Sequence, residues 1–256
     1  MEKDYLTIIK LGGSTVTLKN KPLSANLPVI MELGKIIKQI TTPLIIVHGG
    51  GSFGHHFASK WGLSTSPQNA NPKAIVETRK SMFDLHLLIL ESFSKSNVFP
   101  YTLPPCSILD GDQLSPFTIK FLNVLMKNNL IPITFGDVIV DQSGAYIISG
   151  DKLMEIISSS LPVKKAIFTM DVDGIYENTS SGKSLADTVN TETVLYGLNS
   201  NVNDVTGSIS GKLNSSFKIA KNGIDVHFVN GAYPDRILKV LKGRSYLGSM
   251  IKGDDQ

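Results

Sequence analysis

The sequence of 256 residues predicts an α/β fold: a three-layer αβα sandwich with a central, mostly parallel sheet. Short runs rich in aliphatic and β-branched residues alternate with segments whose apolar residues recur at helical spacing. Several of the strand-like runs are apolar throughout, which is typical of a sheet covered by helices on both faces. No linker or internal repeat divides the chain. We therefore expect one domain over 1–256, with lobes of about 1–150 and 151–256.

In the first half, apolar runs predict strands at 5–11, 43–49 and 130–136, and helical periodicity predicts helices at 27–40, 71–93 and 115–129. In the helix at 71–93, one face collects the following side chains: Ile75, Met82, His86, Ile89 and Phe93. Ser115 followed by proline marks the start of the helix at 115–129, because serine caps helices and proline is favoured at the first helical position.

In the second half, "DVIVDQSGAYIISG" predicts a hairpin over 137–150 that turns at Ser143-Gly144. Helices are expected at 151–161, 212–223 and 234–243, and strands at 164–172 and 224–231. The polar stretch 177–211 is long for a structureless loop inside a compact domain, so we expect a functional lid or loop there.

Composition excludes several classes of protein. With 25 basic and 22 acidic residues, the net charge of +3 and the absence of a basic run argue against nucleic-acid or membrane-surface binding. No signal peptide or apolar run of membrane-spanning length occurs. The single cysteine, Cys106, cannot form an intrachain disulfide and has no neighbour in the sequence that would activate it. We expect a soluble, cytoplasmic protein.

Two phosphate-loop motifs are matched only in part. Gly49, Gly51 and Gly54 satisfy GxGxxG, but a dinucleotide site also needs an acidic residue at the end of the next strand. Glu77 stands at about the right distance and lies inside a helical pattern instead. "GSISGKL" (207–213) is one residue short of a Walker A loop and has leucine where the magnesium-binding hydroxyl belongs.

Four glycine clusters nevertheless follow predicted strands: "KLGGS" (10–14), "HGGGSFGH" (48–55), "SGDK" (149–152) and "DVDG" (171–174). Such turns gather at the carboxyl edge of a parallel sheet, where ligands bind. In addition, Gly211-Lys212 is expected to open a helix and to present a lysine and free amides to an anion. These features predict a ligand that carries more than one phosphate group.

In this order, "KLGGS", "VHGGG", "GDV…ISGD", "DVDGIY", "DVTG…GK" and "VNG" resemble the amino acid kinase superfamily over nearly the whole chain. Within it, "HGGGSFGHHFA" resembles the isopentenyl phosphate kinase family, in which a histidine follows the glycine loop; the related fosfomycin kinases share that histidine. One departure is that the family's loop usually reads like VTGGM, whereas Ser208, Ile209 and Ser210 follow Thr206-Gly207 here.

The resemblance implies a homodimeric kinase of isoprenoid biosynthesis that uses ATP and Mg²⁺ to phosphorylate a prenyl phosphate. It implies an acceptor-binding N-terminal lobe and a nucleotide-binding C-terminal lobe. The alternatives are a fosfomycin-type phosphonate kinase and a non-catalytic nucleotide-binding member of the same fold. The latter would be expected to lack at least one of Lys10, Asp151 and Lys212, and all three are present.

The resemblance also assigns roles to residues. The implied catalytic residues are Lys10, Lys19, His55, Asp151 and Lys212, with Asp151 holding Lys10 and Lys212 in register. The implied acceptor site consists of Gly50, Gly51, Gly54, His55, Ser149 and Gly150, with an apolar slot at Met82, Phe83, Ile147 and Ile148. The implied nucleotide site consists of Lys10, Gly12, Gly13, Ser14, Asp171, Asp173, Gly174, Tyr176, Gly207, Gly211 and Lys212. No metal ligands are expected from the protein, because the triphosphate would supply most of the oxygen ligands of the Mg²⁺ ion. His48, His86 and His227 are interpreted as packing residues, and His56 as structural or exposed.

Overall fold

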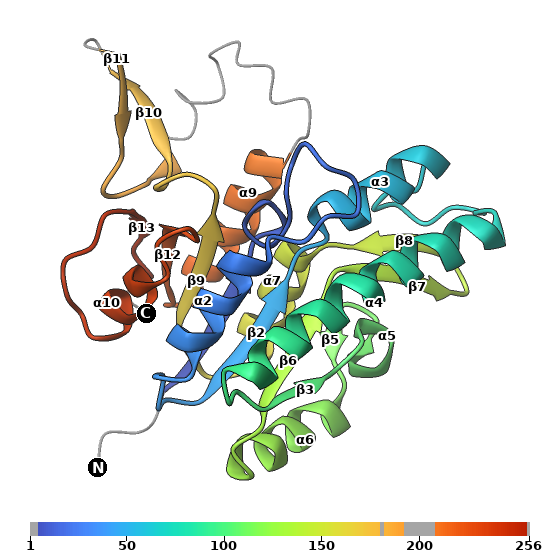
Figure 1. The fold of residues 1–256 in the computed structure, drawn as a ribbon, viewed down its shortest axis with the longest axis horizontal. Helices are drawn as coiled ribbons and strands as arrows, with labels where there is room; N and C mark the ends of the chain where they lie inside the picture. Colours follow the sequence, from blue (N-terminus) through green and yellow to red (C-terminus); the bar gives the residue numbers. More distant parts are fainter. Residues whose placement is uncertain (1–4, 180–181, 192–207, 255–256) are drawn as a thin grey trace.

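A seven-stranded sheet in the order β13-β12-β9-β1-β2-β6-β3 forms the centre of the fold. The computed structural model describes residues 5–179, 182–191 and 208–254 (Figure 1). The strands are β1 (Leu6–Leu11), β2 (Leu44–His48), β3 (Pro100–Thr102), β6 (Ile131–Phe135), β9 (Val163–Met170), β12 (Asp225–Asn230) and β13 (Ser249–Ile251). All neighbouring strands pair in parallel except β13, which is antiparallel to β12. The predicted mostly parallel sheet is confirmed.

Helices cover both faces of this sheet, because its central strands are apolar on both sides. α2 (Leu27–Ile37), α4 (Pro72–Lys95) and α10 (Asp235–Leu241) share one apolar core with Ile9 and Leu11 of β1. α6 (Pro116–Lys127), α7 (Gly150–Ser160) and α9 (Ser208–Ala220) share the other with Ile8 of the same strand. In Figure 1, α2 and α4 lie in front of the sheet and α7 behind it. The predicted αβα sandwich is thus present.

Within the described residues, further helices and three two-stranded pairs lie outside the central sheet. The helices α1 (Gly13–Val16) and α3 (Gly51–Trp61) follow β1 and β2 directly, and α5 (Pro105–Ile108) precedes the small β4 (Leu109–Asp110) and β5 (Gln113–Leu114) pair. β7 (Asp137–Asp141) and β8 (Gly144–Ile148) form the predicted hairpin, and β10 (Tyr176–Thr179) pairs with β11 (Gly182–Leu185). The β10–β11 hairpin projects from the sheet at the upper left of Figure 1.

Three sequence-based expectations need correction. The stretch 177–211 opens with the β10–β11 hairpin, whose polar sequence carries no apolar alternation that would indicate strands. Residues 192–207 of that stretch lie outside the described residues. The helix expected at 212–223 begins at Ser208, so Gly211 and Lys212 do not open it. The strand expected at 164–172 ends at Met170.

Parallel pairing brings the ends of β1, β2, β6, β9 and β12 to one edge of the sheet. The "SGDK" junction differs from expectation, since it follows β8, which lies outside the central sheet. A hydrogen bond nevertheless fixes the base of the β7–β8 hairpin to this edge: the Gly136 amide donates to the His48 carbonyl at 3.1 Å. Both halves of the chain contribute strands to one sheet, and the lobe boundary near residue 150 stays a prediction. Of the helices in the described ranges, none combines the length and apolar character needed to cross a bilayer.

Candidate active site

Lys10 is the only charged residue of β1 and is almost completely buried, at 5% exposure. The alternation of the strand directs it to the same face as Ile8, beneath α7 and α9. In the neighbouring strand β9, Phe168 stands in register with it. The Lys10 ammonium lies 5.8 Å from the centroid of that ring, and the ammonium of Lys212, from α9, lies 5.7 Å from it. Two cations therefore share one aromatic face.

Asp151 joins these two lysines. It occupies the first turn of α7, where its Oδ1 lies 2.5 Å from the Nζ of Lys10 and 3.5 Å from the Nζ of Lys212. The charge pairing that the resemblance implies is thus present in the structure. Two ammonium groups face one carboxylate, so the cluster carries excess positive charge when all three groups are ionised. An anion placed beside it would complete the charge balance.

Burial acts on both signs of charge in this cluster. Desolvation, and secondly the charge of Lys212, lower the pKa of Lys10 to about 7 in spite of the opposing effect of Asp151. Burial alone would raise the pKa of Asp151, but the two lysine charges outweigh it and hold that pKa below its usual range. Near neutral pH, Lys10 is therefore poised between its two protonation states, and a bound anion would draw a proton onto it.

Gly150, at the start of α7, leaves room for the side chain of Lys10. A Cβ at Gly150 would lie 3.1 Å from the Cε of Lys10 and 3.4 Å from the His48 carbonyl oxygen, tighter than ordinary van der Waals contact. Ser149 caps the helix by accepting a hydrogen bond from the Lys152 amide at 3.1 Å. In the structure, Ser149 and Gly150 thus position Asp151 beside Lys10.

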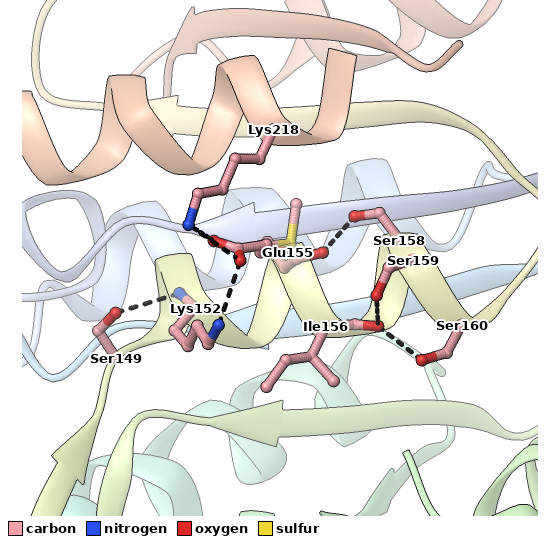
Figure 2. A network of polar contacts seen from close by, with 9 residues as sticks. Ser149, Lys152, Glu155, Ile156, Ser158, Ser159, Ser160 and Lys218 are labelled. Carbon is pink, nitrogen blue, oxygen red and sulfur yellow. Dashed lines mark hydrogen bonds and ion pairs between the residues drawn. The ribbon is translucent and has the colours of Figure 1, made fainter. Parts of the chain in front are cut away.

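A second carboxylate connects α7 to α9. Figure 2 shows Glu155 between Lys152 of its own helix and Lys218 of α9, at 3.1 and 3.3 Å. The partly exposed pair between helices is individually weak. It acts together with the apolar core that α7 and α9 share, to which Leu153 and Leu213 belong. Lys212 is therefore carried on a helix that is fixed to the helix of Asp151.

Two glycine loops meet beside this cluster. A Cβ at Gly13 would lie 2.3 Å from the amide nitrogen of Gly51, so neither loop could shift aside for a side chain at position 13. Gly51 itself has a φ of +46°, a conformation that disfavours other residues. Within the described residues, the Gly50 and Gly51 amides donate no hydrogen bond to the protein. They are therefore available to an anion.

Gly54 differs from the expectation that its amide binds an anion. That amide already donates to the Gly50 carbonyl at 3.1 Å, inside the first turn of α3. The sulfur of Met82 fills the space beneath the loop instead: Cβ atoms at Gly50 and Gly54 would lie 2.7 and 3.0 Å from it. Gly54 therefore provides room for the Met82 side chain.

His55 lies on α3 four residues after Gly51, and so on the same face of the helix. Its side chain is exposed and makes no hydrogen bond with another described residue. Side chains on a helix tilt toward its N-terminus, which here is the glycine loop. The neighbouring His56 is also exposed and makes an edge contact with the Phe57 ring, as expected for a surface residue.

The candidate apolar slot lies on α4. Phe83 packs edge-on against Phe135 at 5.3 Å between ring centroids, one residue beyond Met82. Arg79 reaches over Phe83 from the preceding turn and binds the buried carboxylate of Asp137 through its Nε at 3.1 Å. Ile147 and Ile148 come from β8, on the hairpin that Asp137 begins.

The residues expected on the nucleotide side are already paired with one another. Ser14 donates to Asp171 at 2.9 Å, and Lys19 forms an ion pair with the same carboxylate. Asp173 accepts hydrogen bonds from Arg236 at 2.6 Å and from Asn230 at 3.2 Å. These contacts gather charged groups from the loop after β9, from α10 and from the loop after α1 at the carboxyl edge.

Other residues predicted for the nucleotide have structural surroundings. A Cβ at Gly12 would meet the Thr169 carbonyl oxygen at 2.4 Å, and one at Gly174 would meet the hydroxyl of Ser249 at the same distance. Tyr176 begins β10, and Gly211 is exposed in α9. Gly207 lies outside the described residues.

Sequence reasoning missed several site residues. Phe168 looked like ordinary core, and Arg79 and Arg236 carry no motif; only the three-dimensional pairing with Asp137 and Asp173 reveals them. Glu77, which a dinucleotide site would need at a strand end, lies in α4 and accepts a hydrogen bond from Trp61 at 2.8 Å. Among the described residues, no group of three or more histidine, cysteine, aspartate or glutamate side chains could hold a metal ion.

Comparison with known proteins places these features in context. Residues 6–230 match the sequence profile of the amino acid kinase family. The chain is 31% identical to the isopentenyl phosphate kinase of Thermoplasma acidophilum over 96% of its length and 100% of the relative's. A crystal structure of the product complex of a T. acidophilum isopentenyl phosphate kinase superposes with a TM-score of 0.80 at 27% identity, over 96% of this chain and 100% of the other. The chain is also 28% identical, over 97% of its length and 99% of the relative's, to a [5-(aminomethyl)furan-3-yl]methyl phosphate kinase of Methanocaldococcus jannaschii.

The lowered pKa of Lys10 predicts a pH-dependent stability. The folded chain releases this proton near pH 7, whereas the unfolded chain holds it up to about pH 10.5. Because the unfolded state binds more protons in this window, stability rises with pH there, by at most ~1.4 kcal/mol per pH unit. Lys10→Met should lack that contribution, so the difference in unfolding free energy between wild type and variant should change steadily in favour of wild type from pH 7 to 9.5.

Urea denaturation at several pH values measures this difference. Lys35→Met is the matched control, since Lys35 is exposed and paired only with Glu32 on its own helix. Its stability curve should run parallel to that of wild type. If the stability curve of Lys10→Met also runs parallel to that of wild type, the lowered pKa of Lys10 in the folded state is contradicted.

Proposed function

This chain belongs to the amino acid kinase family, and we propose that it transfers the γ-phosphoryl group of ATP to isopentenyl phosphate, giving isopentenyl diphosphate and ADP. The observation that carries the proposal is the buried Lys10–Asp151–Lys212 cluster beside the glycine loop after β2, whose Gly50 and Gly51 amides donate to no other described residue. The full-length similarity to an isopentenyl phosphate kinase supports the acceptor. The product would enter isoprenoid biosynthesis.

The chemistry requires no general base. A phosphate oxygen of the acceptor bonds to the γ-phosphorus while the bond from that phosphorus to the bridging oxygen of the β-phosphate breaks in line, and ADP leaves. A phosphomonoester has a second pKa of about 6, so its attacking oxygen is already anionic at neutral pH. Catalysis then consists of bringing two anions together and offsetting their charge.

Lys10 and Lys212 supply that positive charge from the two sides of Asp151. We assign both lysines to the phosphates that are being separated, because their ammonium groups are buried, close together and short of countercharge. Asp151 holds the two ammonium groups apart and in place. Lys19, which is exposed and paired with Asp171, would offer a third cation from the rim of the site.

The loop after β2 would bind the phosphate of the acceptor. Its free amides at Gly50 and Gly51 form the N-terminus of α3, a position that favours anions. His55 would donate a hydrogen bond to the same phosphate from the next turn of that helix. Ser149 and Gly150 border this space from the start of α7.

The prenyl tail would lie against Met82 and Phe83 of α4, opposite Ile147. Ile148, the next residue of β8, points to the other side of the hairpin and packs in the core with α7. The ion pair of Arg79 with Asp137 connects α4 to the β7–β8 hairpin and would hold the two elements at a set distance from each other. Burying a chain of about four carbons is worth about 3 kcal/mol at ~0.8 kcal/mol per methylene, or roughly a hundredfold in kcat/KM over a phosphate without a tail.

The nucleotide would bind from the C-terminal half of the chain, and the acceptor from the N-terminal half. Gly12, Gly13 and Ser14 border the cluster on one side, and Gly211 lies one residue before Lys212. We place Asp171, Asp173, Gly174 and Tyr176 near the nucleotide, and Gly207 keeps that assignment by resemblance alone. Mg²⁺ would be held chiefly by the triphosphate and would neutralise its charge.

Two alternatives differ in what they require. A non-catalytic member of the fold would not need the cluster of Lys10, Asp151 and Lys212 that is assembled here. A kinase for a small polar phosphonate or for a furan phosphate would use the same phosphate loop, so the side chains of α4 decide between acceptors. A reducing cytoplasmic setting suits the single, exposed Cys106.

We further propose that the protein forms a homodimer through an aromatic patch made of Tyr101, Phe117, Phe121 and Val124. Phe117 is 72% exposed and stacks on Phe121, which Tyr101 contacts edge-on. Tyr101 belongs to β3, the last strand of the sheet, which presents an open edge. An aromatic patch beside an open edge strand suits a second copy of the chain related by a two-fold axis.

An acceptor panel tests the proposed reaction. With ATP and Mg²⁺, we expect isopentenyl phosphate to be converted with a kcat/KM about a hundredfold above that of methyl phosphate, which lacks the tail. Dimethylallyl phosphate, fosfomycin, [5-(aminomethyl)furan-3-yl]methyl phosphate, UMP and acetylglutamate complete the panel. No turnover of either prenyl phosphate, or a higher kcat/KM for one of the other acceptors, would overturn the proposed substrate.

Replacing His55 tests its contact with the acceptor. His55→Ala should lower kcat/KM for isopentenyl phosphate by about 10- to 100-fold, the value of a hydrogen bond to a charged group. The KM for ATP should change little. His56→Ala is the matched control, since that side chain is exposed on the adjacent position of the same helix, and it should stay within about twofold of wild type. Equal activities of the two variants would exclude the role of His55.

Light scattering after gel filtration tests the dimer. Wild type should elute with twice the mass of the 27.8 kDa chain, and Phe117→Glu should elute as a monomer, because two buried charges would face each other across the two-fold axis. Leu247→Glu is the control, an exposed apolar residue near the opposite edge of the sheet, and should remain dimeric. A monomeric wild type is the result that contradicts the proposal.

A further inference from the structure

A chain of hydrogen bonds runs beneath the glycine loop through three elements of the fold. The Nδ1 of His48 lies 3.1 Å from the carbonyl oxygen of Gly49, and its Nε2 lies 3.0 Å from the Nδ1 of His86. The Nε2 of His86 in turn lies 2.8 Å from the hydroxyl of Thr102. His48 ends β2, His86 belongs to α4, and Thr102 ends β3.

Both imidazoles are buried, with exposures of 0% for His48 and 1% for His86. They stack on each other at 5.2 Å, and Phe135 packs against both rings at 5.2 and 4.4 Å. Desolvation lowers the pKa of His48 to about 4 and, together with His48, that of His86 to about 3. Each ring is therefore neutral at physiological pH and carries one proton.

The Gly49 carbonyl determines where those protons lie. A carbonyl oxygen can only accept, so the Nδ1 of His48 must carry the proton and its Nε2 must be an acceptor. His86 must then donate from Nδ1, which leaves its Nε2 as an acceptor for the Thr102 hydroxyl. Every hydrogen bond in the chain thus has one direction, from Thr102 towards Gly49.

The peptide bond at the end of this chain belongs to the glycine loop. In a planar trans peptide the Gly49 carbonyl and the Gly50 N–H point in opposite directions. Holding the carbonyl towards His48 therefore turns the Gly50 amide away from the core, and within the described residues that amide has no protein acceptor. The other polar groups here are engaged elsewhere: the Gly49 amide donates to Leu11, and the His48 carbonyl accepts from Gly136.

We infer that His86 and Thr102 are positioning residues for the acceptor phosphate, which act by fixing the tautomer of His48 and through it the orientation of the Gly49–Gly50 peptide. This inference rests on the proposed function in so far as the glycine loop binds the acceptor. Without the Thr102 hydroxyl, His86 is free to carry its proton on Nε2. His48 Nε2 then loses its donor, and the tautomer that holds the Gly49 carbonyl is no longer enforced.

A pair of substitutions at position 102 isolates the hydroxyl. Thr102→Val keeps the shape of the side chain and removes the donor, whereas Thr102→Ser keeps the donor and removes the methyl group. Loss of one hydrogen bond predicts a three- to tenfold rise in the KM for isopentenyl phosphate in Thr102→Val. The KM for ATP should stay near wild type, and the melting temperature should fall by a few degrees because the buried Nε2 of His86 loses its partner. Thr102→Ser should behave as wild type in all three measurements. A change shared by both variants, or a parallel rise in both KM values, would overturn the inference.

Ring-nitrogen NMR tests the same inference without any substrate. Two-bond ¹H–¹⁵N correlation spectra of ¹⁵N-histidine-labelled protein distinguish protonated from bare ring nitrogens, and His86→Leu and His55→Ala variants assign the signals. We expect wild-type His48 and His86 both to be protonated at Nδ1, and the His48 signal to change in Thr102→Val and not in Thr102→Ser. A wild-type His48 that is protonated at Nε2, or doubly protonated at pH 7, would refute the inference. The spectra are recorded without substrate, so their result does not depend on which acceptor the panel selects. A wrong substrate proposal can therefore be distinguished from a wrong assignment of the hydrogen-bond chain.

Discussion

The fold buries two ammonium groups beside one carboxylate, and the arrangement of the carboxyl edge of the sheet depends on this ion cluster. Lys10 extends from the central strand, Asp151 from a helix on one face, and Lys212 from the neighbouring helix, so the two halves of the chain meet at a single oxygen. Apolar side chains on the same face would pack there at lower electrostatic cost. In the proposed function, a bound anion would offset the cost of the buried charges, and the same groups would serve binding and catalysis.

Glycine has a different use at each strand end. At positions 13 and 51 it allows two loops to touch, at position 150 it gives Lys10 a passage, and at position 54 it leaves room for a methionine. Of these glycines, Gly51 belongs to the loop whose Gly50 and Gly51 amides donate to no other described residue. The repeated glycine clusters in the sequence therefore mark close approaches of the backbone to its neighbours, and the ligand site emerges where those approaches leave amides uncovered.

The sequence was sufficient to predict the sandwich, its main strands and the pairing of Asp151 with Lys10 and Lys212, because long apolar periodicity and an ordered set of motifs carry that information. It was insufficient where partners are distant in the chain and belong to no motif. His48 and His86 were interpreted as packing residues, and nothing in their spacing joins them to Thr102. The same holds for Arg79 with Asp137. The hairpin β10–β11 escaped prediction because its strands are polar, and the early start of α9 because serine and glycine are weak helix formers.

The contact between Gly13 and Gly51 has a consequence for altering this protein by directed evolution. Since any side chain at position 13 would collide with the backbone at position 51, single substitutions at that point are closed to a search that proceeds one mutation at a time. On α4, Met82 shares this constraint because its sulfur packs beneath Gly50 and Gly54, whereas Phe83 packs against Phe135. A search for altered acceptor preference would therefore begin at Phe83 and leave Met82, His86 and the two loops unchanged.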